Sequence, residues 1–327
     1  MTTLITGAGL IGCQTAALLA ARGERVVLLD LRPDPALIAS VLPLAQVTLE
    51  AADVRDRAAL QALFERHRPR AVLHTAAALS MAIRAQPVLA ADVNFGGTVN
   101  LLEAARAIGV QRFLLASSTT VVYPTFHRAW PGPIGEDFAF HSVSERPGSL
   151  YAASKLAAEF FVQHYGDQFG LSVGVLRYSA VLGLWAGPNN SVPGRLMATL
   201  LGQGAEGGVV QLRDPLLLWS GGDDFIDARD VAAANVAALP APRLPGRVYT
   251  IGSGRLTRFE DFVAAARAVR PRLQQAPVVL PATGFAGFPH QRNQPFDVSR
   301  AQSELGFTAR RSLQESMADA ARFVPEP

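Results

Sequence analysis

Apolar runs that suit buried strands alternate with alanine-rich, helix-like stretches through the first 180 residues. The runs include "TLIT" (3–6), "RVVLLD" (25–30), "AVLHTAA" (71–77), "RFLLASS" (112–118) and "SVGVLRYS" (172–179). Nearly continuous apolar character is typical of parallel strands that are covered on both faces. Since parallel strands need a right-handed crossover, usually through a helix, this alternation predicts an α/β fold with a doubly wound parallel sheet.

A glycine-rich turn joins the first strand to the first predicted helix. It reads "TGAGLIG" (6–12) and places Gly7, Gly9 and Gly12 in the spacing Gly-x-Gly-x-x-Gly. In this context Gly7 allows a tight turn, Gly9 lets the backbone approach a pyrophosphate, and Gly12 lets helix and strand pack closely. The free N–H groups at the start of the helix favour the same anion, so the turn predicts a dinucleotide site.

Two aspartates follow the next two strand candidates. Asp30 ends the second strand, where a carboxylate can accept from both ribose hydroxyls of an adenosine and would repel a 2′-phosphate, which favours NAD. Arg32 is the kind of side chain that accommodates such a phosphate, so NADP remains the alternative. Asp53 closes "QVTLEAAD" (46–53) and suits either the adenine amino group or the cap of the next helix.

After residue 180 the alternation gives way to Gly-, Pro- and Asn-rich sequence over 183–224. Helical candidates return at "FEDFVAAARAV" (259–269) and in two pieces over 298–323. We expect residues 1–180 to form an NAD-binding Rossmann domain, to which 225–255 return, and 181–327 to form mainly a smaller C-terminal substrate-binding lobe. Residues 123–150 are predicted as a long loop, and such loops are usually functional or disordered.

Composition and charge argue against several other classes of protein. The single cysteine, Cys13, excludes an internal disulfide and fits the cytoplasm. No apolar run reaches the roughly 18 residues of a membrane helix, and we expect no signal peptide. Although the pI is about 9.4, the net charge is only +3 and the basic residues form no run, so no nucleic-acid partner is expected. The six histidines are scattered, so no metal site is predicted.

The motif "YAASK" (151–155) holds the only lysine of an otherwise arginine-using chain. Tyr151 and Lys155 lie four residues apart near the start of a predicted helix over 150–169, so both side chains share one face. A phenol with a pKa near ~10 is a poor base, and a nearby ammonium favours the phenolate. We therefore expect Tyr151 to exchange a proton with the substrate hydroxyl. Lys155 is expected to lower the pKa of Tyr151 and to hold the ribose hydroxyls of the nicotinamide with its compact ammonium.

Hydroxyl-bearing residues follow the fifth strand in "ASSTTVVY" (116–123). Because the carboxyl ends of parallel strands form the ligand-binding edge of such a sheet, these hydroxyls suit contacts with a substrate oxygen. The plainer alternative is that they satisfy the backbone of a turn.

Together these features resemble the extended short-chain dehydrogenase/reductase family, which includes NAD-dependent nucleotide-sugar epimerases and dehydratases. The resemblance also rests on "HTAA" (74–77), "VNFGGTVN" (93–100), "LRYSAVLG" (176–183), "DDFIDARDVA" (223–232) and "SELGF" (303–307). It implies Tyr151, Lys155 and Thr119 as catalytic residues. The cofactor contacts that follow from the motifs and the resemblance are Gly7, Gly9, Leu10, Ile11, Gly12, Asp30, Asp53, Val54, Thr75, Ala76, Ala77, Asn94, Ser117, Tyr151, Lys155 and Tyr178.

Several features depart from the family pattern, among them Pro124, which replaces the usual glycine after "VVY". The glycine turn is one residue shorter than the usual Gly-x-x-Gly-x-x-Gly. Ala180 stands where nucleotide-sugar enzymes usually carry an asparagine near the diphosphate, and Asp223 stands where they usually carry an arginine that pairs with it. Because a carboxylate repels a phosphate, we expect a substrate that lacks a nucleoside diphosphate.

We therefore expect NAD-dependent hydride transfer at a secondary alcohol or ketone carbon of a small, polar, sugar-like substrate. The enzyme would be a dehydrogenase or an epimerase. A nucleotide-sugar 4-epimerase is the alternative, and an NAD-sensing regulator without turnover is the alternative from another class. The Tyr151–Lys155 pair disfavours the regulator, and Thr120, where dehydratases carry an acid, disfavours a dehydratase.

Substrate contacts and a partner complete the expectations. The predicted substrate-binding residues are Ser118, Thr119, Tyr151, Asn189 and Arg195. The last two come from "GLWAGPNNSVPGR" (183–195), which equally suits a plain surface loop. The helices around 94–108 and 150–169 resemble those that form a four-helix dimer interface in the family, which implies a homodimer.

Overall fold

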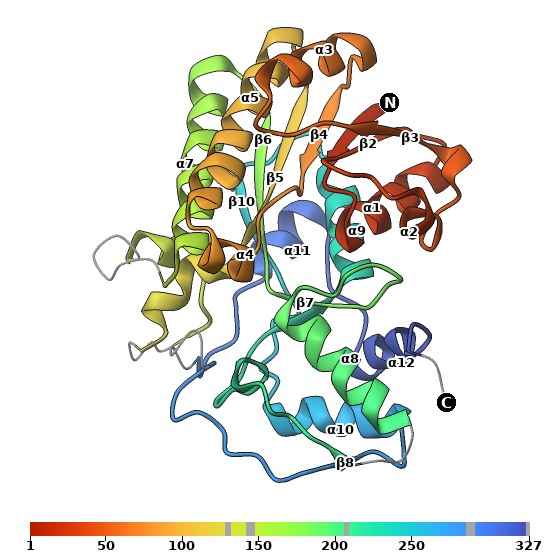
Figure 1. Cartoon of the computed structure of the whole chain (residues 1–327). Coiled ribbons are helices and arrows are strands. Elements are labelled where there is room, and N and C mark those ends of the chain that lie inside the picture. Colours follow the sequence, from red (N-terminus) through yellow and green to blue (C-terminus); the bar gives the residue numbers. More distant parts are fainter. Residues whose placement is uncertain (128–131, 142–147, 206–208, 286–291, 325–327) are drawn as a thin grey trace.

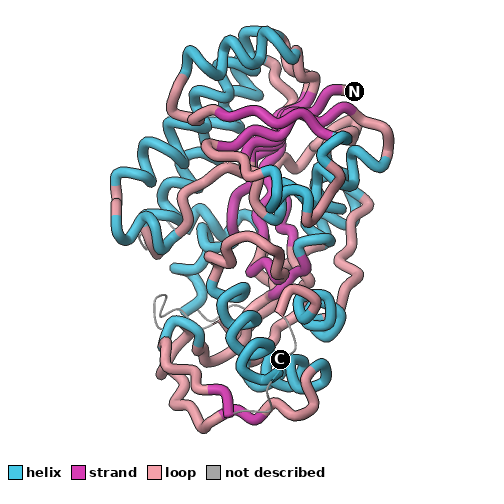
Figure 2. The backbone as a smooth tube through the Cα atoms, turned by 45° about the vertical axis from the view of Figure 1, so that its right-hand side comes forward, coloured by secondary structure: helices cyan, strands magenta, loops and turns pink. Residues whose placement is uncertain are grey.

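A seven-stranded parallel sheet forms the centre of the protein (Figures 1 and 2). The computed structural model describes residues 1–127, 132–141, 148–205, 209–285 and 292–324. The strands are β1 (Thr2–Thr6), β2 (Arg25–Asp30), β3 (Val47–Ala51), β4 (Ala71–His74), β5 (Arg112–Ser118), β6 (Val173–Tyr178) and β10 (Val248–Ile251). Their order is β10-β6-β5-β4-β1-β2-β3, which confirms the predicted doubly wound architecture.

The winding reverses between β1 and β4, which are neighbours in the sheet. Leu4 and Ile5 of β1 and Val72 and Leu73 of β4 are fully buried, as their continuous apolar runs predict. Ligands of open α/β sheets bind outside the carboxyl ends of the strands at such a reversal. The glycine turn leaves β1 at this point.

Helices cover both faces of the sheet (Figure 1). One face carries α3 (Arg57–His67), α5 (Gly97–Ile108) and α7 (Leu150–Phe169), whose apolar residues pack around Phe113. The other carries α1 (Leu10–Ala21), α9 (Ala228–Ala238) and α11 (Ser299–Leu305), which pack around Tyr249. Shorter elements are α2 (Pro35–Ala39), η1 (Leu44–Gln46), α4 (Ser80–Ala85) and a π-helical turn, η2 (Ala90–Gly96), that runs into α5.

A smaller lobe lies beyond the carboxyl edge of the sheet (Figures 1 and 2). It is built from α8 (Val192–Ala205), β8 (Val209–Val210), η5 (Pro215–Leu217), α10 (Phe259–Val269), β11 (Gln274–Gln275) and α12 (Leu313–Ala321). Trp219 lies at its centre, stacked on Phe285 and edge-on to Phe259 and Phe262. A short parallel pair, β7 (Ala180–Leu182) with β9 (Phe225–Asp227), connects the lobe to the sheet half.

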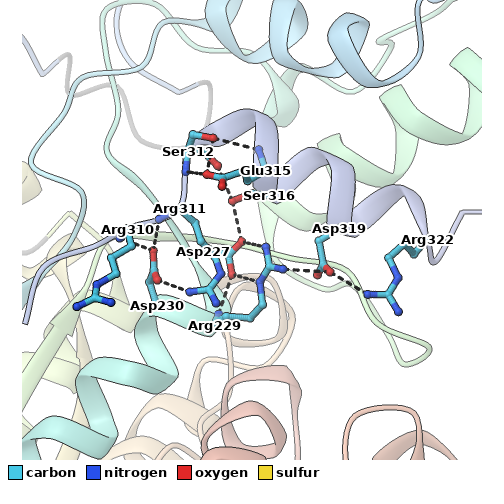
Figure 3. A network of polar contacts seen from close by, with 10 residues as sticks. All are labelled: Asp227, Arg229, Asp230, Arg310, Arg311, Ser312, Glu315, Ser316, Asp319 and Arg322. Atoms are coloured by element: carbon cyan, nitrogen blue, oxygen red, sulfur yellow. Dashed lines mark hydrogen bonds and ion pairs between the residues drawn. The ribbon is translucent and has the colours of Figure 1, made fainter.

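Carboxylates at the start of α9 hold the C-terminal segment in place (Figure 3). Asp227 accepts from the Ser316 hydroxyl of α12 at 2.7 Å. Asp230 accepts from the backbone N–H groups of Arg310 and Arg311 at 2.9 and 2.8 Å, and from the Arg311 side chain. These contacts fix α12 against the element that leads back into the sheet half.

Two segments differ from the sequence-based expectation. Residues 183–195 do not form a loop throughout, because α8 begins at Val192. The Ser191 hydroxyl accepts from the backbone N–H of Gly194, which is the usual cap of a helix start. Within 123–150, the structure contains short helices, η3 (Thr119–His127) and η4 (Glu136–His141), and residues 128–131 and 142–147 lie outside the described part.

None of the helices in the described ranges combines the length and the apolar character that crossing a membrane requires.

Candidate functional site

A cavity of about 980 Å³ lies at the carboxyl edge of the sheet and reaches the smaller lobe. Its wall includes most of the residues predicted to contact cofactor or substrate. From those sets it contains Gly7, Gly9, Leu10, Ile11, Gly12, Asp30, Asp53, Val54, Thr75, Ala76, Ala77, Ser117, Ser118, Thr119, Tyr151, Tyr178 and Asn189. Asn94, Lys155 and Arg195 are not among its lining residues.

The glycine turn has the shape that a dinucleotide pyrophosphate needs. Gly7 has a φ of +93°, and a Cβ there would lie 2.8 Å from the backbone nitrogen of Ala76. A Cβ on Gly12 would lie 1.9 Å from the carbonyl oxygen of Gly7. At Gly9, by contrast, a Cβ would meet nothing within 4 Å, so open space lies in front of the helix start.

The start of α1 also fits an anion. Gly9 is the N-cap residue and offers no side-chain cap, and the first turn carries no acidic residue. The first N–H groups of a helix have no partner within it, and the helix dipole favours negative charge at this end. These residues therefore fit the pyrophosphate of NAD.

Asp30 lies at the predicted ribose end of the cavity. One carboxylate oxygen accepts from the N–H of Ala8 at 2.8 Å and the other from the N–H of Arg32 at 3.1 Å. These bonds fix the carboxylate, and a carboxylate has about four acceptor sites, so it retains the capacity to accept ribose hydroxyls.

Asp53 lines the cavity and is held by its neighbour Arg55. The Arg55 guanidinium donates to both carboxylate oxygens, with Nη2 2.6 Å from Oδ2, and this contact lowers the pKa of Asp53. The helix-cap alternative for Asp53 is wrong, because Asp56 caps α3 by accepting from Ala59. The adenine contact of Asp53 stays a prediction.

Asn94 lies behind the cavity wall instead of in it. Its amide accepts from the N–H of Ala78 at 2.7 Å, donates to the carbonyl of Ala78 at 3.0 Å, and donates to the hydroxyl of Ser154 at 3.1 Å. The side chain is 1% exposed. Asn94 thus joins the loop after β4 to α7, and its contribution to the site is to fix these two elements.

Tyr151 and Lys155 lie on the first turns of α7. The Lys155 ammonium is 5.9 Å from the centroid of the Tyr151 ring and donates to the carbonyl of Ala116 in β5 at 2.9 Å. Burial raises the pKa of Tyr151 to about 12, and a hydrogen bond with the Ser118 side chain acts in the opposite direction. The expected lowering of that pKa by Lys155 is therefore not found in the protein alone.

The hydroxyl groups of Ser118 and Thr119, at the end of β5, contact different tyrosines. Ser118 interacts with Tyr151, whereas Thr119, which is 2% exposed, interacts with Tyr123. Both Ser118 and Thr119 line the cavity. The catalytic role of Thr119 stays a prediction, and Ser118 is the residue that contacts the phenol.

A buried ion pair behind this wall was not predicted. Glu159, one turn after Lys155 on α7, is bound by Arg177 of β6 through Nη2–Oε2 at 2.6 Å and Nε–Oε1 at 2.9 Å. Glu159 also accepts from the Ser117 hydroxyl at 2.5 Å. Glu159 and Arg177 are 1% and 4% exposed. The four-residue spacing from Lys155 was the one sequence signal for this cluster.

The far end of the cavity contains the substituted positions. Ala180 and Asp223 both line it. Asp223 is bound by the Arg292 guanidinium and accepts from the N–H of Asp224 at 2.8 Å. Burial raises the pKa of Asp223 to about 6, against the lowering effect of Arg292. Arg292 was not singled out from the sequence, because it lies 69 residues from its partner.

Asn189 and Arg195, the two substrate-binding residues predicted from 183–195, have different surroundings in the structure. Asn189 lines the cavity, whereas Arg195 lies on α8, pairs with Asp214 and is not among the lining residues. Tyr178 lines the cavity and directs its hydroxyl to Asn235 at 2.6 Å.

Comparisons with known proteins agree with this geometry. Residues 3–252 match the sequence model of a family described as the NAD dependent epimerase/dehydratase family. Curated relatives include UDP-glucuronate 4-epimerase 4 of Arabidopsis thaliana, which is 26% identical over 99% of this chain and 75% of its own length. Another is dTDP-L-rhamnose 4-epimerase of Burkholderia thailandensis, which is 28% identical over 99% of this chain and 94% of its own length.

Solved structures are similar over the whole length. The complex of Thermus thermophilus UDP-glucose 4-epimerase with NAD superposes with a TM-score of 0.81 at 27% identity, covering 99% of both chains. The UDP-glucose 4-epimerase of Stenotrophomonas maltophila, with bound NAD and formylated UDP-arabinopyranose, gives the same TM-score and identity over 99% of this chain and 97% of its own.

Proposed function

Because this chain belongs to the NAD-dependent epimerase/dehydratase family, we propose that it oxidises and reduces a secondary alcohol carbon of a sugar-like substrate that lacks a nucleoside diphosphate. It is an enzyme of the extended short-chain dehydrogenase/reductase type, and NAD is its cofactor. The proposal rests on the position of Asp223, whose buried carboxylate lies in the wall of the same cavity as Tyr151. A carboxylate there repels the phosphates of a nucleoside diphosphate.

The residues at the reacting end have separate tasks. Tyr151 takes the proton of the substrate hydroxyl, while Ser118 and Thr119 hold the oxygen as charge develops on it. Lys155 supplies a fixed positive charge that favours the phenolate. NAD, when bound, supplies the hydride acceptor at its nicotinamide ring, next to the carbinol carbon that these residues orient.

We propose an epimerase in preference to a dehydrogenase. In an epimerase the ketone stays in the cavity, turns, and receives the hydride on its opposite face, after which Tyr151 returns the proton. In a dehydrogenase the ketone leaves. The similarity of this chain to several 4-epimerases over 99% of its length supports the first outcome.

A nucleotide-sugar 4-epimerase is the second candidate. The curated relatives act on UDP- and dTDP-sugars by their names, and Arg292 provides a cation beside Asp223. In that case Arg292 would have to exchange the Asp223 carboxylate for a diphosphate.

A substrate screen separates these candidates. The purified enzyme is incubated with NAD and with sugars, sugar acids or UDP-sugars, while absorbance of NADH and product stereochemistry are followed. We expect a free sugar or sugar acid to be converted to its epimer without net NADH accumulation. Conversion of UDP-sugars alone would assign the second candidate, and steady NADH accumulation would assign a dehydrogenase.

We also propose a homodimer built on α5 and α7. Phe160 and Phe161 of α7 are 40% and 43% exposed, and Phe161 packs edge-on against Phe95 with ring centroids 4.8 Å apart. Exposed aromatic residues that are neighbours on one helix favour a protein partner. Sedimentation velocity at micromolar concentration is expected to give a dimer, and a monomer alone would contradict the proposal.

The single cysteine supports a cytoplasmic location. Cys13 is buried, and burial raises the pKa of its thiol to about 12, so it is a structural residue that requires no oxidising compartment.

A further inference from the structure

A buried polar cluster connects α7 to β5 and β6 directly behind the cavity wall. Lys155 donates to the carbonyl of Ala116, and Ser117, the next residue of β5, donates to Glu159 at 2.5 Å. Lys155 and Glu159, one turn apart on α7, thus each make a polar contact with β5. Arg177 binds Glu159 through both carboxylate oxygens and also donates to the carbonyl of Glu136 at 2.6 Å.

Burying an ion pair such as Glu159–Arg177 costs free energy, and the buried pair stabilises a fold only weakly compared with apolar packing. Removing two charges from water costs several kcal/mol per ion, and well-packed apolar residues often replace buried ion pairs without loss of stability. The surrounding α7 core, with Ala158 and Val162 fully buried, is apolar. A carboxylate in this position therefore calls for a role besides packing.

We propose that Glu159 is a positioning residue of the active site, which holds the charge of Lys155 and the hydroxyl of Ser117 in place beside Tyr151. The proposal rests on the role proposed above for Lys155. Its central measurement, however, needs neither substrate nor cofactor, so failure of one does not imply failure of the other.

The charges around Lys155 support this role. Burial lowers the pKa of Lys155 to about 8, and the Glu159 carboxylate acts against that loss. The other titratable groups that face this region are Tyr151 on α7, His74 on β4 and Arg177 on β6. Tyr151 and His74 are neutral near pH 7, because the pKa of Tyr151 is raised to about 12 and that of His74 is lowered to about 3. Arg177 adds a cation that Glu159 itself compensates.

The sole lysine of the chain makes the test direct. Protein produced without a lysine-containing tag, in the presence of lysine labelled with carbon-13 at Cε, gives one lysine Cε resonance, which belongs to Lys155. Its chemical shift follows the protonation of the ammonium as pH is raised. In Glu159→Gln we expect the titration midpoint to fall by on the order of one pH unit, because the opposite charge is gone and Arg177 is uncompensated.

Two further variants distinguish positioning from a purely structural effect. Glu159→Asp keeps the charge and is expected to restore most of the wild-type midpoint. Asp230→Asn makes the same chemical change in a buried carboxylate that also holds an arginine, away from the cavity, and is expected to leave the midpoint unchanged. If Glu159→Gln does not fold, Glu159→Gln with Arg177→Gln removes both charges of the pair. The midpoint is then expected to fall by less than in Glu159→Gln alone, because Arg177 no longer adds a cation near Lys155.

A midpoint that stays at the wild-type value in a folded Glu159→Gln protein would overturn the proposal. Once a substrate is known, the alkaline limb of kcat/KM should move to lower pH in Glu159→Gln and stay in place in Asp230→Asn. An equal loss of activity at every pH in both variants would instead assign Glu159 to stability alone.

Discussion

The Lys155 ammonium lies 5.9 Å from the centroid of the Tyr151 ring and donates to the carbonyl of Ala116, so the effect proposed for it on the phenol acts through its charge. Charge acting through a buried, low-dielectric region depends strongly on whether the ammonium keeps its proton. The protonation of Lys155 therefore sets the upper pH limit of the proposed chemistry.

Activity is expected to fall as pH rises through about 8, the pKa to which burial lowers Lys155. Above that pH the ammonium loses the charge that favours the phenolate. The measurement is kcat/KM between pH 6 and 10 for the wild-type enzyme. An activity that stays level to pH 10 would show that the charge of Lys155 is not required.

The free energy of unfolding is expected to rise with pH over the range in which activity falls. The pKa of Lys155 is about 8 in the folded protein against a usual value of 10.5, so the unfolded chain binds the proton more tightly. Between these values the unfolded state holds a proton that the folded state has released, and the free energy of unfolding rises with pH. Relative to Lys155→Met, the wild-type protein should gain up to about 3 kcal/mol from pH 7.5 to pH 10.5 in urea denaturation. A constant difference between the two proteins would contradict the lowered pKa.

Tyr151→Phe is expected to reduce kcat by on the order of 10³-fold, because it removes the group that exchanges the substrate proton. Binding of NADH, followed by fluorescence, should stay close to wild type, because the ring is retained. Tyr165→Phe on the same helix is the matched control, since the Tyr165 hydroxyl contacts Glu103 outside the cavity at 3.0 Å. Turnover that survives in Tyr151→Phe would refute the assignment.

The local patterns of the sequence predicted most of the fold and the cofactor. Continuous apolar strands and the glycine turn are local features whose geometry follows from sterics, so the parallel sheet and the NAD dependence were predicted and are confirmed. The family resemblance is likewise confirmed. The "YAASK" spacing correctly placed Tyr151 and Lys155 on one helix, α7.

Contacts between distant segments were not predictable in the same way. Asp223 meets Arg292, and Arg195 turns to Asp214, only because the lobe folds back over residues far apart in sequence. No spacing rule marks such a pair. Lys155 was expected to lower the pKa of Tyr151. The burial of each side chain, which shifts its own pKa, depends on the packing of α7 against β5 and is not marked in the sequence.

Asp223→Asn is expected to increase affinity for UDP by roughly tenfold, because it removes a negative charge from the cavity wall beside the Arg292 guanidinium. Titration calorimetry with UDP measures the effect. Asp214→Asn is the control, because this acid also pairs with an arginine but does not line the cavity. Tight UDP binding by the wild-type protein, with no gain in the variant, would contradict the proposed substrate class.

Alanine substitutions at two glycines of the same turn are expected to have different effects: Gly9→Ala should weaken NADH binding, whereas Gly12→Ala should reduce stability. At Gly9 a Cβ meets nothing within 4 Å, and the φ of −80° is open to any residue, so Gly9→Ala should fold with nearly unchanged stability. The added methyl group would occupy the space that a pyrophosphate needs, and NADH affinity should fall by at least ~10-fold. At Gly12 a Cβ would lie 1.9 Å from the Gly7 carbonyl oxygen, so Gly12→Ala should lose stability first. Thermal unfolding together with NADH fluorescence titration separates the two, and a Gly9→Ala protein that binds NADH normally would place the pyrophosphate elsewhere.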